Sequence, residues 1–152
     1  MKIYTSGQVR QIDAYTIENE PIESIDLMER AAGIFFKWMM QKNLGKYDHL
    51  IVCAGPGNNG GDGLAVARLL LSRGYEVLPI IIQPGEGGSN DFLVNAERIK
   101  EHTQTVKRIE EFPDLRGFRV IIDALFGSGL SRPVTGLYAE VIQAVNKSDA
   151  AR

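Results

Sequence analysis

The sequence lacks the features that mark several classes of protein. Its single cysteine, Cys53, can form neither an intramolecular disulfide nor a cysteine-based metal site, and its apolar surroundings predict a core residue. The formal net charge of −2 gives no electrostatic footprint for nucleic acid, and no basic block suggests an anionic membrane. No apolar run approaches the length of a transmembrane helix, and the N-terminus lacks the apolar core of a signal peptide. We therefore expect a cytoplasmic protein.

The length and composition of the chain fit one compact domain covering residues 1–152, with 44% hydrophobic residues. Its most informative stretch is HLIVCAGPGNNGGDGLAVARLLLSR, residues 49–73. The first six residues are mostly apolar and include the β-branched Ile51 and Val52, which predicts a strand buried on both faces. From Leu64 the apolar spacing becomes helical. The stretch therefore predicts a strand, a glycine turn and a helix in direct succession.

The glycines of this turn indicate a close approach to the backbone. Gly55, Gly57, Gly60, Gly61 and Gly63 lie within nine residues, and each glycine carries an entropic cost. A helix N-terminus offers unpaired N–H groups and a partial positive charge, which favour a phosphate. A tight connection without a ligand is the other interpretation.

Two known phosphate motifs can be compared with the turn. A Walker loop ends in Gly-Lys-Ser/Thr, whereas Gly63 is followed by Leu64, so nucleotide hydrolysis is disfavoured. Residues 55–60 match GxGxxG, but that fingerprint needs an acid at the end of the next strand. The strand expected over 75–82 ends in Gln83 instead. An ordinary hydride-transfer dehydrogenase is therefore less favoured.

The rest of the chain predicts a three-layer α/β/α Rossmann-like sandwich, with a mainly parallel sheet and two leading N-terminal helices. Helices are expected over 6–19, 24–41, 64–73, 90–102 and 135–146, and strands over 49–54, 75–82, 105–109 and 120–122. Thr5 and Gln8 have capping-box spacing at the first helix. Val9, Ile12, Tyr15 and Ile17 give that helix a mainly apolar face. In the fourth helix, an inward face is expected at Phe92, Leu93, Ala96 and Ile99.

A second glycine loop, FGSGLSRP, follows the strand expected over 120–122. Asp123 stands at the end of that strand, where parallel sheets bind their ligands, so its carboxylate is a functional candidate. The loop's glycines allow a close approach, and Ser128, Ser131 and Arg132 can donate hydrogen bonds to phosphate or ribose oxygens. We expect the two glycine loops to meet at one edge of the sheet.

Three blocks of the sequence resemble one family. GPGNNGGDG at residues 55–63 resembles the signature of the YjeF N-terminal domain family, the NAD(P)HX epimerases. Residues 5–33 resemble the opening helices of that family, and VIIDALFGSGL at residues 120–130 resembles its second signature.

The resemblance implies an isomerase of nicotinamide cofactor repair, which interconverts the R and S epimers of hydrated NADH and NADPH. It implies a homodimer and a fused or separate NAD(P)HX dehydratase. It places the dinucleotide substrate at Asn58, Asn59, Gly60, Gly61 and Asp62, and at Gly127, Ser128, Gly129, Leu130, Ser131, Arg132 and Pro133. It makes Asn59 and Asp123 the ligands of a potassium ion, in keeping with their hard oxygen donors. We expect Asp123 to be the general acid or base, and Asp62 takes that role if potassium lowers the basicity of Asp123.

The family's later D-x-P-S-G segment does not occur in these residues. We therefore expect a chain truncated before that segment. Two alternatives to the epimerase stay open: a non-catalytic nucleotide- or protein-binding module of the same fold, and an NAD(P)-dependent oxidoreductase.

Overall fold

The computed structural model describes residues 3–42, 44–83, 85–128, 130 and 133–151. Within them the chain forms α1 (Ser6–Asn19), α2 (Ser24–Met40), β1 (Leu50–Ala54), α3 (Asn58–Ser72), β2 (Val77–Ile82), α4 (Asn90–Ile99), β3 (Gln104–Val106), β4 (Val120–Ala124) and α5 (Gly136–Lys147). Two short 3₁₀ helices, Lys100–His102 and Ile109–Glu111, complete the described elements.

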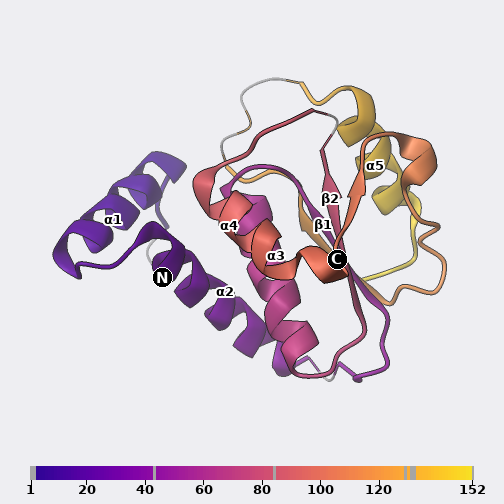
Figure 1. Cartoon of the computed structure of the whole chain (residues 1–152), viewed down its shortest axis with the longest axis horizontal. Helices are drawn as coiled ribbons and strands as arrows, with labels where there is room; N and C mark the ends of the chain where they lie inside the picture. The colour runs from indigo at the N-terminus through magenta and orange to yellow at the C-terminus, as the bar shows by residue number, and fades with distance from the viewer. Residues whose placement is uncertain (1–2, 43, 84, 129, 131–132, 152) are drawn as a thin grey trace.

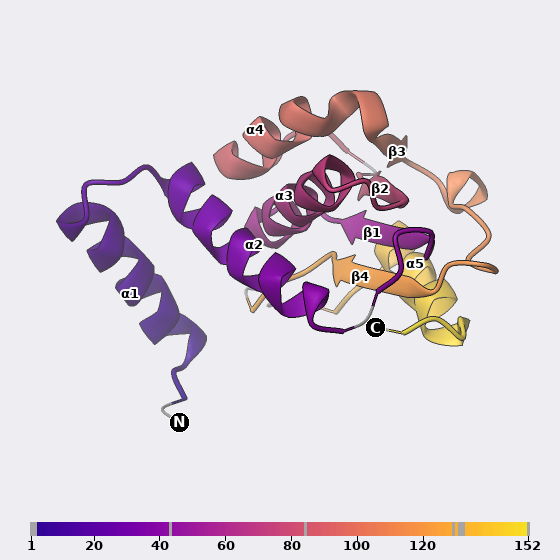
Figure 2. The same ribbon diagram turned by 90° about the horizontal axis from the view of Figure 1, so that it is seen from below.

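The four strands form one parallel sheet in the order β3-β2-β1-β4. Every residue of β1 is buried, as the run of apolar residues predicts. Helices α3 and α4 cover one face of the sheet and α5 covers the other (Figure 2). The predicted α/β/α sandwich is therefore confirmed. Because β2 and β4 flank β1 on opposite sides, the order of the strands reverses beside β1, where open α/β sheets bind ligands.

The first helix stands away from the sheet and packs on α2 (Figure 1). Its N-terminus has the predicted capping box between Thr5 and Gln8. The predicted helix is present, but its mainly apolar face is not buried: α1 contains no buried residue, and Tyr15 is 67% exposed. A helix that packs against one other helix, and not against the sheet, leaves most of its apolar side chains exposed.

Several predicted boundaries also need correction. Helix α3 begins at Asn58, six residues before Leu64, because the glycines pack within its first turns. Strand β4 continues to Ala124, so Asp123 lies inside the strand. The third strand ends at Val106, and residues 109–111 form a 3₁₀ helix. On α4, Phe92 and Ile99 are buried as predicted, but Asn95 is also buried and Leu93 is 48% exposed.

The core between α2 and α3 supports a stability prediction. Leu70 is fully buried and packs in a cluster that includes Phe36 and Met39 of α2. Replacing a buried leucine by alanine removes apolar contacts and leaves a cavity, so Leu70→Ala should lower the free energy of unfolding by about 3 kcal/mol. Urea unfolding followed by circular dichroism measures the loss. The half-exposed Leu93 gives the control, and an equal loss for Leu93→Ala would contradict this account of the core.

No helix among the described residues has both the length and the apolar content needed to cross a membrane.

Candidate functional site

The turn after β1 is held by direct contacts between backbone atoms. A Cβ atom at Gly60 would lie 1.7 Å from the carbonyl oxygen of Gly55. The first turn of α3 therefore lies against the end of β1, at a distance that only glycine permits. Gly63 packs similarly, since its Cβ would lie 2.5 Å from the Cβ of Ala124. Packing within the protein thus accounts for these glycines.

Gly57 differs from these glycines. It is the N-cap of α3, and no atom lies within 4 Å of the position that its Cβ would occupy. No side chain caps the helix, so the first N–H groups of α3 point out of the helix without a capping partner. This is the position in the turn where a ligand can approach the backbone, and the helix end favours an anion.

The two glycine loops meet, as the sequence predicts. A Cβ at Gly55 would lie 2.2 Å from the carbonyl oxygen of Leu125 in the second loop. The side chain of Asn59 lies against Gly127, with its Oδ1 atom 3.7 Å from the position of a Cβ there. The loops after β1 and β4 therefore form one continuous surface at the carboxyl edge of the sheet.

A cavity of about 670 Å³ opens between these loops and α1. Its described walls are Ser6, Val9, Arg10 and Asp13 of α1, Pro56, Gly57, Asn58, Asn59 and Asp62 of the first loop and α3, and Leu125, Phe126, Gly127, Ser128 and Leu130 of the second loop. A cleft at the reversal point of a parallel sheet is the usual position for a nucleotide in this fold class.

The structure brings together part of the predicted substrate-binding set. Asn58, Asn59, Asp62, Gly127, Ser128 and Leu130 line the cavity. Gly60 and Gly61 are buried in the first turns of α3 behind it, and Pro133 is exposed outside its described walls. Gly129, Ser131 and Arg132 lie outside the described residues.

Asp62 is the carboxylate of α3 that lines the cavity. Burial, followed by the nearby charges of Asp13 and Asp91, raises its pKa from 3.8 to about 6. Its carboxylate has no hydrogen bond or ion pair among the described residues. A carboxylate with a pKa near neutrality and no partner can both take up and release a proton.

Asp123 has a different environment. Its side chain is exposed, and its Oδ1 atom accepts a hydrogen bond of 3.0 Å from the N–H of Leu125. It is paired in register with Cys53, which is fully buried as predicted. Burial, followed by the charge of Asp123, raises the pKa of the Cys53 thiol to about 12. Asp123 does not belong to the described walls of the cavity.

Comparison with known proteins gives the family. The family described as YjeF-related protein N-terminus matches residues 24–152. This chain belongs to that family. An NAD(P)H-hydrate epimerase of Lentilactobacillus buchneri is 39% identical over 146 residues, which are 96% of this chain and 67% of the relative. An NAD(P)H-hydrate epimerase of Limosilactobacillus reuteri is 37% identical, over 97% of this chain and 69% of the relative.

A solved structure supports the same fold. The crystal structure of yeast ynu0 (YNL200c) aligns with a TM-score of 0.73 at 21% identity, covering 97% of this chain and 65% of the yeast chain. The three-layer arrangement that the sequence of this YjeF-related domain predicts therefore also occurs in a solved structure.

Helix α1 contributes residues to the site of this YjeF-related domain that the sequence alone does not indicate. Ser6, Val9, Arg10 and Asp13 repeat at helical spacing and face the cavity from one side of α1. Their spacing was readable in the sequence. The apolar residues of the same helix form the more evident pattern, so the sequence alone gives no function to the polar face.

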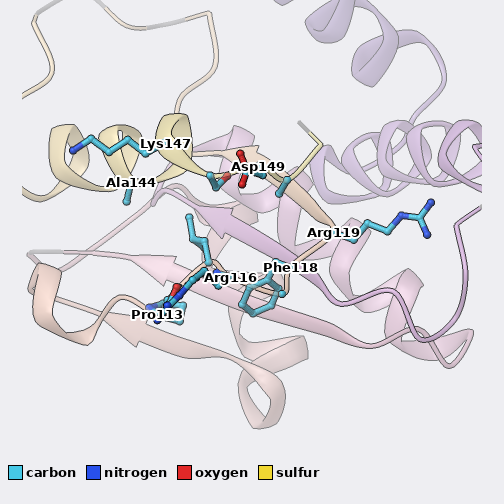
Figure 3. Close-up of a pocket in the computed structure, with 12 residues that line it drawn as sticks. Pro113, Arg116, Phe118, Arg119, Ala144, Lys147 and Asp149 are labelled. Carbon is cyan, nitrogen blue, oxygen red and sulfur yellow. Dashed lines mark hydrogen bonds and ion pairs between the residues drawn. The ribbon is translucent and has the colours of Figure 1, made fainter.

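A second cavity, of about 560 Å³, lies near the amino ends of the strands (Figure 3). It is bounded by the segment 113–119 before β4 and by residues 144–150 at the end of α5. Two of its arginines already have carboxylate partners, since Arg116 pairs with Asp114 and Arg119 pairs with Asp48. No described residue of either glycine loop lines this cavity.

Proposed function

We propose that this chain is an NAD(P)H-hydrate epimerase that interconverts the R and S epimers of NADHX and NADPHX. The observation that carries the proposal is the family match together with relatives of that name at 37–39% identity over nearly the whole chain. The cavity between the two glycine loops supports it, because it lies where this fold class binds nucleotides. The reaction is an isomerisation and needs no net redox change.

The proposed binding mode uses both loops. The open backbone at Gly57 and the first N–H groups of α3 receive the phosphates of the dinucleotide. Residues 58–62 contact the substrate from one side and residues 127–133 from the other. Asn59 is well placed for this role, because its side chain lies at the junction of the loops.

The proposed proton transfer involves a carboxylate. Inversion at the hydroxyl-bearing carbon requires a bond to break and form again, and a positioned acid or base assists both steps. Asp123 and Asp62 are the two candidates. The walls of the cavity favour Asp62, which lines the cavity without a partner, whereas Asp123 is exposed and bonded to the Leu125 backbone.

Potassium is the proposed ion of this site, with Asn59 and Asp123 as ligands. The donors fit in kind, since amide and carboxylate oxygens are hard ligands. Asn59 lies against Gly127 in the loop that begins directly after β4, the strand that contains Asp123. The N–H of Leu125 bonds to Oδ1 of Asp123, so among the described residues Oδ2 is available as an oxygen ligand. A bound cation there would stabilise negative charge near the cavity.

We also propose that the protein is a homodimer. Ile12 and Tyr15 of α1 and Ile34, Phe35 and Trp38 of α2 are large apolar side chains that are 39% to 67% exposed. Such a patch on two neighbouring helices is typical of a protein interface. Sedimentation of the protein and of an Ile34→Glu variant measures this directly, and a wild-type monomer at micromolar concentration would exclude the dimer.

The test of the function is a chromatographic assay with R-NADPHX and with R-NADHX in potassium buffer. Appearance of the S epimer well above the rate of spontaneous conversion is expected. The Lentilactobacillus buchneri relative serves as the positive control. Binding of the substrate without conversion would favour the non-catalytic nucleotide-binding module, and oxidation or reduction of an added carbonyl substrate would favour an oxidoreductase.

A further inference from the structure

One face of α1 forms a wall of the cavity, although α1 has no buried residue. Ser6, Val9, Arg10 and Asp13 follow the i, i+3, i+4, i+7 spacing of a single helix face, and all four line the cavity. A helix that makes so few contacts with the body of the protein needs another reason for its position. Its polar face toward the cavity provides one.

Arg10 is the positive charge on that face, and it has no acidic partner. Among the described arginines, Arg10 and Arg73 lack a carboxylate within ion-pair distance. Arg73 lies over the ring of Phe36 instead. Arg10 makes one long hydrogen bond, 3.4 Å from its Nε atom to the carbonyl oxygen of Ser6 in its own helix. Its guanidinium is therefore exposed toward the cavity with donors unused.

The charges of the cavity are divided between two regions. Asp13 is close enough to Asp62 to affect its protonation, so the acidic groups lie together beside the second turn of α3. Arg10 precedes Asp13 by about one turn of α1. The N-terminus of α3 adds a second positive region at Gly57. The guanidinium of Arg10 and the N-terminus of α3 therefore both border the cavity, at positions apart from the acidic pair of Asp13 and Asp62.

We propose that Arg10 binds a phosphate group of the dinucleotide, so that α1 is part of the substrate site. A planar guanidinium with unused donors matches the geometry of phosphate oxygens. The identity of the ligand rests on the proposed function. The phosphate is either one of the pyrophosphate linkage or the 2′-phosphate that distinguishes NADPHX from NADHX.

The test is calorimetric titration with ADP-ribose and with 2′-phospho-ADP-ribose, using the wild-type chain and the variants Arg10→Gln, Arg10→Lys and Arg73→Gln. Arg10→Gln should weaken binding about tenfold or more, and Arg10→Lys should recover part of the loss. Arg73→Gln removes the same charge at the far end of α3 and should bind like the wild type. Circular dichroism checks that each variant is folded.

The pattern of losses identifies the phosphate. Equal weakening for both probes supports the pyrophosphate, and weakening for the 2′-phosphorylated probe alone supports the 2′-phosphate. Unchanged binding of both probes to Arg10→Gln overturns the proposal, as does a wild-type chain that binds neither probe. Because the titration needs no turnover, a wild-type chain that binds through Arg10 but does not epimerise would refute the proposed function and leave the Arg10 proposal standing.

Discussion

Asp62→Asn is expected to lower the turnover of epimerisation about a hundredfold or more while making the protein more stable. The loss follows if the Asp62 carboxylate transfers the proton, since general acid–base groups contribute about 10² to 10⁴ in rate. The gain in stability follows from its environment. The pKa of Asp62 is raised by burial to about 6, so its charged form is disfavoured in the folded protein.

The sign of the stability effect is fixed by the direction of that shift. The folded protein has a pKa about 6 at Asp62, above the ordinary 3.8, so the folded state binds the proton more tightly than the unfolded state. The destabilisation is complete above pH 6 and disappears as the pH falls toward 3.8. Asparagine carries no charge, so Asp62→Asn should raise the free energy of unfolding by about 1 to 2 kcal/mol near pH 7.5, allowing for partial exposure. The gain should vanish near pH 4.

The control is Asp123→Asn, which replaces the other candidate carboxylate. If Asp62 acts as the general base, the wild-type enzyme should lose activity as the pH falls through about 6, and if it acts as the general acid, activity should fall as the pH rises through about 6; Asp123→Asn should keep that pH dependence even if its rate falls. A potassium titration tests the proposed role of Asp123 as a potassium ligand. If Asp123 binds the ion, Asp123→Asn should need more potassium for half-maximal activity. Normal turnover in Asp62→Asn, with most turnover lost in Asp123→Asn, would assign the proton transfer to Asp123 instead.

Gly60→Ala is expected to destabilise the protein by about 3 kcal/mol or more. The new Cβ would lie 1.7 Å from the carbonyl oxygen of Gly55, and both groups belong to the backbone, so neither can move aside as a side chain would. Overpacking of this kind costs about 1 to 3 kcal/mol in ordinary cores and more where the neighbour is rigid. Urea unfolding measures the change, and a variant found only in the insoluble fraction would also agree with the expectation.

Gly57→Ala provides the matched control three residues earlier. Its Cβ would meet no atom within 4 Å, and the backbone of Gly57 has a φ of −94°, which alanine adopts readily. Its stability should stay within about 0.5 kcal/mol of the wild type, as for exposed substitutions elsewhere. Substrate binding should nevertheless weaken, because the methyl group would enter the open side of the turn. Equal stability losses in the two variants would refute the packing account.

The sequence predicts the central elements well because their signals are local. The apolar run before Gly55 is long enough to define a buried strand, and the capping box of Thr5 and Gln8 defines the start of α1 at the residue observed. The start of α3 could not be read in this way. Glycine has low helix propensity, so residues 58–63 resemble a loop, and their helical conformation depends on contacts with β1, α2 and β4.

The sequence predicts only some of the residues of the site, because the others are brought there by packing between helices and not by a local pattern. Asn58, Asn59 and Asp62 stand out in the sequence because polar residues interrupt a glycine motif. Arg10 and Asp13 do not stand out, because charged residues on a surface helix are common. Their approach to the cavity depends on the angle between α1 and the sheet, which follows from the packing of α1 on α2 and from no local pattern.

Because Cys53 is buried, the reaction of its thiol with a reagent can be used to measure opening of the protein core. The thiol lies fully buried in β1, one of the two inner strands of the sheet, and its pKa of about 12 leaves almost no thiolate at neutral pH. A thiol reagent can therefore react only when β1 separates from its neighbours, which requires the core to open. Since the chain contains no other cysteine, the labelling rate of the wild-type protein measures how often the whole sheet opens, and no engineered probe is needed.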